Sequence, residues 1–171
     1  MGLGKTIQTI AFLYHLHSHE NMLGPFLVLA PLTTLPQWRR EIEEWTHFNC
    51  LLYYDEGGAS ARQAIQDYEF YHLHTTRRGD IIASQMPKFQ VLLTNYELFV
   101  ADVELFLKIP FQHVVLDEAH RLKNKQAKQT MTISRLPCVR KTLLTGTPIQ
   151  NNTKELWTLL NFIEPLTFRS E

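Results

Sequence analysis

The amino-acid sequence predicts an α/β fold, in which a mostly parallel β-sheet is flanked by helices. Three observations indicate this class. Short apolar segments alternate with segments of helical periodicity, glycine and proline bound the clearest apolar segment, and the chain opens with residues typical of a phosphate-binding loop. Since 171 residues suit about one domain and 44% of them are apolar, we expect a single packed domain.

The predicted strands are apolar runs that are too short for helices. The clearest run lies between Gly24-Pro25 and Pro31, which are strong breakers of regular structure. Because the strands of a parallel sheet are buried on both faces, such runs are continuously apolar instead of alternating. The predicted strands are 26–30, 50–54, 91–94, 114–117 and 142–145.

The predicted helices lie between these strands. The segment that begins at Pro36 is the best example, because proline suits the first turn of a helix. In this segment Trp38, Ile42 and Trp45 share one apolar face, which favours core packing for Trp45. The predicted helices are 5–17, 36–45, 61–71, 97–107, 127–135 and 154–163.

The segment 55–88 has the weakest pattern. It contains Gly57-Gly58, one helical stretch and Arg77-Arg78-Gly79. No interdomain linker or internal repeat occurs in the sequence. We therefore interpret 55–88 as an insertion within one domain.

The first six residues, M-G-L-G-K-T, match the closing part of the phosphate-loop pattern G-x-x-x-x-G-K-[ST]. In such loops glycines let backbone N–H groups approach phosphate oxygens, a lysine reaches the β- and γ-phosphates, and a hydroxyl binds Mg²⁺. The candidate residues are Gly2, Gly4, Lys5 and Thr6. A glycine turn that only caps a helix is the alternative. Since no strand precedes the loop, we expect the chain to be a fragment of a longer protein.

A second candidate site follows the apolar run 114–116. Asp117 and Glu118 stand at its carboxyl end, the edge at which open α/β sheets bind ligands. Asp117 suits Mg²⁺ binding, and Glu118 suits polarising the water that attacks a γ-phosphate. For this pair alone, an acidic helix N-terminus would be the alternative. With a phosphate loop upstream, nucleotide hydrolysis is favoured.

The charge pattern supports a nucleic-acid partner only locally. Lysine and arginine total 17 and aspartate and glutamate total 17, so the bulk charge favours no polyanion. Between residues 121 and 141, however, seven basic residues occur without any acidic one, which fits contacts with a phosphate backbone. A solvated helix face is the alternative. The seven are Arg121, Lys123, Lys125, Lys128, Arg135, Arg140 and Lys141.

Two other protein classes are excluded. The two cysteines, Cys50 and Cys138, are too few and too far apart for a disulfide scaffold or a thiolate zinc site. The apolar runs fall short of the roughly 18 residues that a membrane span needs. We therefore expect neither a disulfide-rich protein nor a membrane protein.

Five sequence motifs occur in an order that resembles one protein family. They are M-G-L-G-K-T at 1–6, L-V-L-A-P-L at 27–32, L-L-T-N-Y-E-L at 92–98, D-E-A-H at 117–120 and L-L-T-G-T-P-I-Q-N-N at 143–152. Together they resemble the first motor lobe of the sucrose-non-fermenting family of chromatin-remodelling ATPases. The segment with Y-E-F-Y-H is most similar to the chromodomain-helicase-DNA-binding branch. The resemblance implies a RecA-like P-loop lobe over residues 1–171 that lacks its first strand and is truncated at both ends.

The resemblance also implies roles for individual residues, with ATP and Mg²⁺ as cofactors. Catalysis is implied for Lys5, Asp117 and Glu118, and Mg²⁺ binding for Thr6 and Asp117. Nucleotide contacts are implied for Gly2, Gly4, Lys5, Thr6, Asp117 and Glu118. Coupling between nucleotide state and movement is implied for His120, Thr145, Gly146 and Thr147. DNA contacts are implied for Pro31, Thr33, Thr94, Asn95, Tyr96, Arg121, Lys123 and Asn124, and Trp38 falls in the first of these segments.

By resemblance, the complete protein is a nuclear, ATP-dependent translocase that acts on double-stranded DNA in nucleosomes, with a second motor lobe in the same polypeptide and no membrane. Nothing in this chain matches the second lobe, so we expect the chain alone to be inactive. A small-molecule or nucleotide kinase would share the phosphate loop but would not need the D-E-A-H motif. A related RNA helicase usually has serine-alanine-threonine where this chain has 145–147. A truncated chain that acts only as a binding scaffold is the third alternative.

Overall fold

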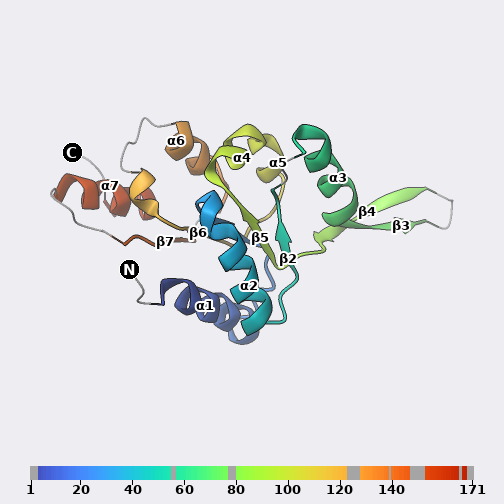
Figure 1. Ribbon diagram of the computed structural model, residues 1–171, viewed down its shortest axis with the longest axis horizontal. Helices are drawn as coiled ribbons and strands as arrows, with labels where there is room; N and C mark the ends of the chain where they lie inside the picture. The colour runs from blue at the N-terminus through green and yellow to red at the C-terminus, as the bar shows by residue number, and fades with distance from the viewer. Residues whose placement is uncertain are drawn as a thin grey trace.

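The computed structural model describes residues 4–54, 57–76, 80–122, 128–138, 140–146, 153–165 and 167–168. Within these ranges, a five-stranded sheet has the strand order β2-β5-β1-β6-β7, and every pairing in it is parallel. The strands are β1 (Phe26–Leu29), β2 (Cys50–Leu52), β5 (Val91–Thr94), β6 (His113–Leu116) and β7 (Lys141–Leu143). Helices lie on both sides of this sheet (Figure 1), so the predicted fold class is confirmed.

The two faces of the sheet bury alternate residues of the same strand. In β1, Phe26 and Val28 pack in one core with helices α1 (Lys5–His19) and α2 (Leu35–Trp45). Leu27 and Leu29 of the same strand pack in a second core on the opposite face. Burial from both sides explains why this strand is a continuous apolar run. The helices of the second face are α3 (Ala59–Glu69), α4 (Tyr96–Ala101), α5 (Val103–Phe106), α6 (Lys128–Ser134) and α7 (Thr153–Ile163). None of the described helices is long and apolar enough to cross a membrane.

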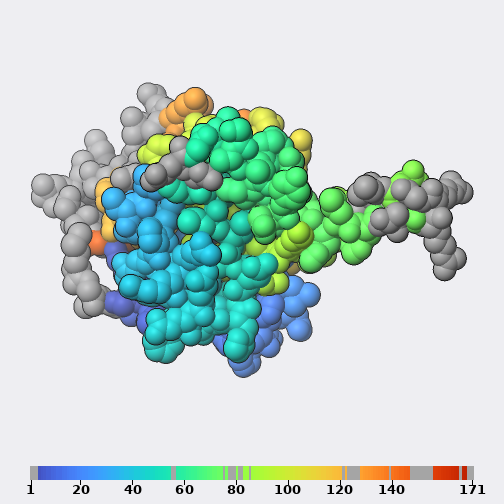
Figure 2. Space-filling view, turned by 45° about the vertical axis from the view of Figure 1, so that its right-hand side comes forward, coloured from blue at the N-terminus to red at the C-terminus, as the bar shows by residue number. Residues whose placement is uncertain are grey.

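A hairpin that the sequence did not predict projects from the body of the molecule (Figures 1 and 2). It pairs β3 (Tyr71–Thr75) with β4 (Ile81–Pro87) in an antiparallel two-stranded sheet of its own. The apolar side chains Leu73 and Met86 are 62% and 53% exposed. Because the strands pair with each other and do not join the main sheet, they lack the two-sided covering that marks the central strands of that sheet.

The helix expected over 97–107 is divided at Asp102 into α4 and α5. The Asp102 carboxylate accepts hydrogen bonds from Tyr53 Oη and Arg62 Nε, both at 2.8 Å. Burial, followed by the hydrogen bond to Asp102, raises the pKa of Tyr53 to about 12, so this hydroxyl keeps the proton that it donates. Asp102 therefore serves as an anchor for α3 at the point where the helix breaks.

The expectation that Trp45 packs in the core is wrong. Trp38 and Ile42 are 1% exposed in the core, whereas Trp45 is 60% exposed. It lies in the last turn of α2 and lines a groove of about 330 Å³ together with Ile10 and Tyr14 of α1. Within the described residues, no further layer covers the outer surface of these two helices, so the end of the apolar stripe stays open to solvent.

His113 is a buried histidine at the start of β6. Its Nε2 lies 2.8 Å from Thr142 Oγ1 of β7, and its Nδ1 is buried with no hydrogen-bond partner among the residues that the structure describes. Burial, with a smaller contribution from the nearby Arg140 cation, lowers the pKa of His113 from 6.5 to about 4. His113 is therefore neutral in the folded protein at physiological pH.

We predict that acid destabilises the protein through this residue. Between pH 6.5 and about 4 the unfolded chain binds a proton at His113 that the folded chain does not, so the free energy of unfolding falls as the pH falls through this window. Urea unfolding of the protein at pH 7 and pH 5, compared with His113→Val, measures the effect. The variant should show a smaller loss of stability on acidification, and a control His47→Gln at an exposed position should behave as wild type. An equal pH dependence in His113→Val would contradict the prediction.

Candidate functional site

The first turn of α1 carries Lys5 and Thr6 directly after Gly4. Gly4 has φ 71°, a left-handed conformation that favours glycine because a Cβ would be strained there. The Gly4 carbonyl accepts the first bond of the helix from Gln8 N at 2.9 Å. The first N–H groups of any helix have no partner within the helix, which makes the start of α1 a suitable place for an anion. Gly2 lies outside the described residues.

The acidic pair Asp117-Glu118 follows β6 in a turn that two neighbouring strands hold. Asp117 N donates to Leu29 O at the end of β1, and Ala119 N donates to Leu144 O just after β7, both at 2.8 Å. Glu118 has φ 51°, which is uncommon for a residue with a side chain and is often found at functional sites. The turn therefore lies at the carboxyl edge of the sheet, in a fixed and locally strained conformation.

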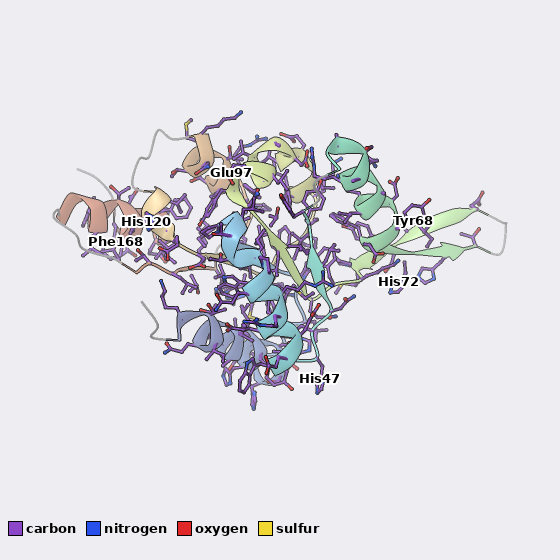
Figure 3. All side chains as sticks on the ribbon, viewed as in Figure 1. His47, Tyr68, His72, Glu97, His120 and Phe168 are labelled. Carbon is purple, nitrogen blue, oxygen red and sulfur yellow. The ribbon has the colours of Figure 1, made fainter. Side chains whose placement is uncertain are left out.

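The structure brings Lys5, Glu118 and His120 together. Lys5 Nζ lies 3.5 Å from Glu118 Oε1, although 113 residues separate them. On the other side of the same carboxylate, His120 Nδ1 lies 3.0 Å from Glu118 Oε2 without the geometry of a hydrogen bond. In Figure 3, His120 lies at the opposite end of the molecule from His72 of the projecting hairpin. Glu118 thus bridges the start of α1 and the 3₁₀ helix η2 (Ala119–Leu122).

Asp117 is buried and held by several hydrogen bonds. Its Oδ2 accepts from Trp38 Nε1 at 3.0 Å, and its Oδ1 accepts from Glu118 N at 2.9 Å. Its main-chain carbonyl accepts from Tyr96 Oη at 2.6 Å. Trp38 and Tyr96 are residues whose connection to Asp117 sequence reasoning missed. No sequence signal could identify these contacts, because 79 and 21 residues separate the partners.

The segment after β7 approaches the lysine. A Cβ atom at Gly146 would lie 3.6 Å from Lys5 Nζ, so the chain passes close to the ammonium group here. Thr145, which precedes Gly146 in the chain, is partly buried, and Thr147 lies outside the described residues. Two of the residues expected to couple nucleotide state and movement, Gly146 and His120, are therefore within reach of the Lys5–Glu118 pair.

The residues expected to contact DNA differ in the exposure of their side chains. Thr33 is exposed in the 3₁₀ helix η1 (Leu32–Thr34). Four others have buried side chains, so any direct contact with DNA would involve their main-chain groups: Pro31, Thr94, Asn95 and Tyr96.

Two of these buried side chains, those of Thr94 and Asn95, make hydrogen bonds with nearby main-chain groups. Thr94 Oγ1 donates to Tyr53 O at 2.9 Å, and Asn95 Oδ1 caps α4 by accepting from Leu98 N at 2.7 Å. Strand ends that continue directly into helices use their polar side chains for caps and turns. The side chain of Arg121, and Lys123 and Asn124, lie outside the described residues.

The described basic residues of the stretch 121–141 do not lie on one surface. Arg135 pairs with Glu104 at 2.8 Å. Lys141 is partly buried with its Nζ 5.1 Å from the centre of the Phe162 ring, and burial lowers its pKa. Arg140 and Lys141 stand at the start of β7, whereas Arg121 follows the end of β6, so they lie at opposite edges of the parallel sheet.

The donor set fits a Mg²⁺ ion that is shared with phosphate groups. Among the described residues, no group of three or more His, Cys, Asp or Glu could form an all-protein metal site. Mg²⁺ typically binds through one or two carboxylates together with substrate phosphates and water. Each Asp117 carboxylate oxygen accepts one hydrogen bond and retains a second lone pair. Thr6 stands partly exposed in the first turn of α1, where its hydroxyl is a second candidate ligand.

Comparisons with known proteins agree with one another. The family described as SNF2-related domain matches residues 1–171. The chain is 44% identical over all 171 residues to chromodomain-helicase-DNA-binding protein 7 of Homo sapiens. The same identity holds for chromodomain-helicase-DNA-binding protein 8 of Homo sapiens and protein 6 of Rattus norvegicus. The chain spans 6% of the length of each of these relatives.

A solved structure supports the same likeness. The Sulfolobus solfataricus SWI2/SNF2 ATPase core in complex with dsDNA superposes with a TM-score of 0.75 and 28% sequence identity. The match covers 96% of this chain and 30% of that chain. The arrangement of strands and helices described above is therefore that of one part of a larger core.

Proposed function

Because this chain belongs to the SNF2-related domain family, we propose that it is the first motor lobe of an ATP-dependent translocase that moves double-stranded DNA on nucleosomes. The resemblance to the sucrose-non-fermenting family and its chromodomain-helicase-DNA-binding branch is confirmed over the full chain. The proposal adds that the lobe hydrolyses ATP with a second lobe of the same polypeptide, and that the complete protein acts in the nucleus.

The contact between Lys5 and Glu118 is the observation that carries the proposal. A lysine at a helix start and an acid at the end of a buried strand meet at 3.5 Å, at the edge where parallel sheets bind nucleotides. A triphosphate presents more negative charge to Lys5 than one carboxylate does. In the proposed mechanism Lys5 therefore moves from Glu118 to the phosphate oxygens, and Glu118 becomes free to polarise the attacking water.

Other residues of the site support nucleotide binding. Backbone N–H groups at Gly2 and Gly4 and at the start of α1 would hold phosphate oxygens. Thr6 and Asp117 would hold Mg²⁺, which when bound neutralises charge on the β- and γ-phosphates. In this proposal His120 and the segment 145–147 couple the state of the phosphates to movement of the motor. The support is that His120 and Gly146 lie beside the Lys5–Glu118 pair.

The DNA part of the proposal rests on the relatives and on local charge. The solved structure was determined with double-stranded DNA, and the curated relatives are named as DNA-binding proteins. In this chain the exposed Thr33 and the sequence after Glu118 offer the contacts that we propose. The buried side chains of 94–96 hold the backbone of that segment in place, so we propose no direct side-chain contact for them.

ATP hydrolysis by the complete protein tests the proposal. We expect duplex DNA to stimulate phosphate release, and duplex RNA of the same sequence to stimulate it much less. Stimulation by RNA in place of DNA would support the RNA-helicase alternative and overturn ours. Nucleotide binding without hydrolysis in the presence of any nucleic acid would support the binding scaffold.

We predict that the double variant Arg121→Ala/Lys123→Ala weakens DNA binding equally for unrelated sequences. Loss of two phosphate contacts should reduce the slope of log K against log salt concentration by about 0.9 per contact. Fluorescence anisotropy with several duplexes between low and moderate salt gives this slope. Lys108→Ala is the matched control, because Lys108 is exposed just before β6 at the opposite edge of the sheet. An effect confined to one DNA sequence, or an unchanged slope, would contradict backbone recognition.

A further inference from the structure

Trp38 and Asp117 form a buried hydrogen bond between two layers of the fold. The indole Nε1 donates to Asp117 Oδ2 at 3.0 Å, and the two residues are 1% and 7% exposed. A donor to a carboxylate in such a dry environment makes a strong, charge-assisted bond. The bond therefore constrains the direction in which the carboxylate points.

The other hydrogen bonds of Asp117 do not connect its carboxylate to a distant element of the fold. Glu118 N, which binds Oδ1, belongs to the same turn and moves with Asp117. The bonds from Asp117 N to Leu29 O and from Tyr96 Oη to Asp117 O hold only the main chain. Among the described residues, Trp38 is thus the donor from a distant element that acts on the carboxylate itself.

Trp38 is also rigidly connected to the segment 31–34. It is the fourth residue of α2, and η1 leads into α2 without a break, because Leu35 at their junction is already helical. Thr34 N and Thr34 Oγ1 both donate to Pro31 O at 2.9 Å, which closes this segment into a tight turn. A displacement of the turn would therefore move the first turn of α2 and its indole.

We propose that Trp38 is a positioning residue that orients the Asp117 carboxylate for Mg²⁺ and links this orientation to DNA contact at the segment 31–34. The inference rests on the proposed function of the site. Contact at the exposed Thr33 changes the placement of α2, and the indole N–H transmits the change to the acidic turn. DNA and Mg²⁺-nucleotide binding are thereby coupled through one hydrogen bond.

The variant Trp38→Phe in the complete protein tests the positioning role, because it keeps an aromatic ring and removes the N–H donor. Binding of a fluorescent, non-hydrolysable ATP analogue is titrated with Mg²⁺. We expect the Mg²⁺ concentration at half-maximal binding to rise about tenfold or more, the range typical for loss of a residue that orients a metal ligand. Trp45→Phe is the matched control, since Trp45 lies on the same helix and is 60% exposed; its titration should match that of wild type.

The same titration in the presence of duplex DNA tests the coupling. In the wild type DNA should shift the Mg²⁺ midpoint, and in Trp38→Phe the shift should be lost. An unchanged midpoint in Trp38→Phe, or a DNA-induced shift as large as in wild type, would overturn the inference. Failure of the wild type to bind the analogue or to hydrolyse ATP would instead count against the proposed function, so the two failures are distinguishable.

A second replacement covers the case in which Trp38→Phe does not fold. The replacement Trp38→benzothienylalanine retains the shape of the indole with sulfur in place of N–H. It should raise the Mg²⁺ midpoint while leaving the thermal unfolding midpoint near that of wild type. A wild-type Mg²⁺ midpoint in this folded protein would overturn the positioning role.

Discussion

Replacing Lys5 with alanine in the complete protein is expected to abolish measurable ATP hydrolysis, with a loss of at least about 10² in kcat/KM. Lys5 is the cation that the structure places beside Glu118 at the start of α1, and Gly146 approaches the same ammonium group. Without this charge, the phosphates lose a donor that would stabilise the charge developing during phosphoryl transfer. A phosphate-release assay with saturating duplex DNA measures the effect.

The loss should be one of function and not of folding. The Lys5–Glu118 ion pair spans 3.5 Å, and its side chains are 32% and 24% exposed, so it contributes only about 0 to 1 kcal/mol to stability. The thermal unfolding midpoint of Lys5→Ala should therefore stay near that of wild type. Lys108→Ala, which removes an exposed lysine at the opposite edge of the sheet, should retain full activity. Full ATPase activity in Lys5→Ala would refute the assignment of the phosphate loop.

Glu118→Gln is expected to slow hydrolysis by about 10² to 10⁴ while nucleotide binding stays measurable. The amide has the size of the carboxylate but cannot accept a proton from water. It also removes the charge that holds Lys5 in the nucleotide-free protein, so binding should be as tight as in wild type or tighter. Single-turnover hydrolysis and equilibrium binding of ATP, measured on the same preparation, separate the two effects.

The control for this variant is Glu44→Gln, which changes an exposed glutamate of α2. It should leave both binding and hydrolysis as in wild type. If binding and hydrolysis fall together in Glu118→Gln, then Glu118 has a structural or metal-binding role in the site, and the water-activating role is wrong.

The sequence predicted the centre of the main sheet well because β1, β5 and β6 are buried on both faces. β1 and β5 were expected at 26–30 and 91–94 and are found at Phe26–Leu29 and Val91–Thr94. Their continuous apolar runs are too short for helices and are typical of buried parallel strands. The acidic pair was expected at the carboxyl end of a strand and lies there, directly after β6. Local composition was sufficient in both cases.

Other features depended on contacts between segments that are distant in the sequence. Trp45 shares the apolar face of Trp38, yet only Trp38 lies over the sheet. The hairpin of β3 and β4 is held by pairing between its own strands, with little burial to mark it. At the break between α4 and α5, Asp102 bonds to Tyr53 and Arg62, partners that no local pattern indicates.

The sequence by itself determined the fold class and the family, and it predicted residues for the candidate site, because hydrophobic periodicity and short motifs are local properties of a chain. Only the tertiary structure decided how those residues are related. It placed Lys5 against Glu118, turned Tyr96 into the core and joined Trp38 to Asp117. These contacts depend on which strands become neighbours and on which face each helix packs, and both are fixed by the packing of the whole molecule.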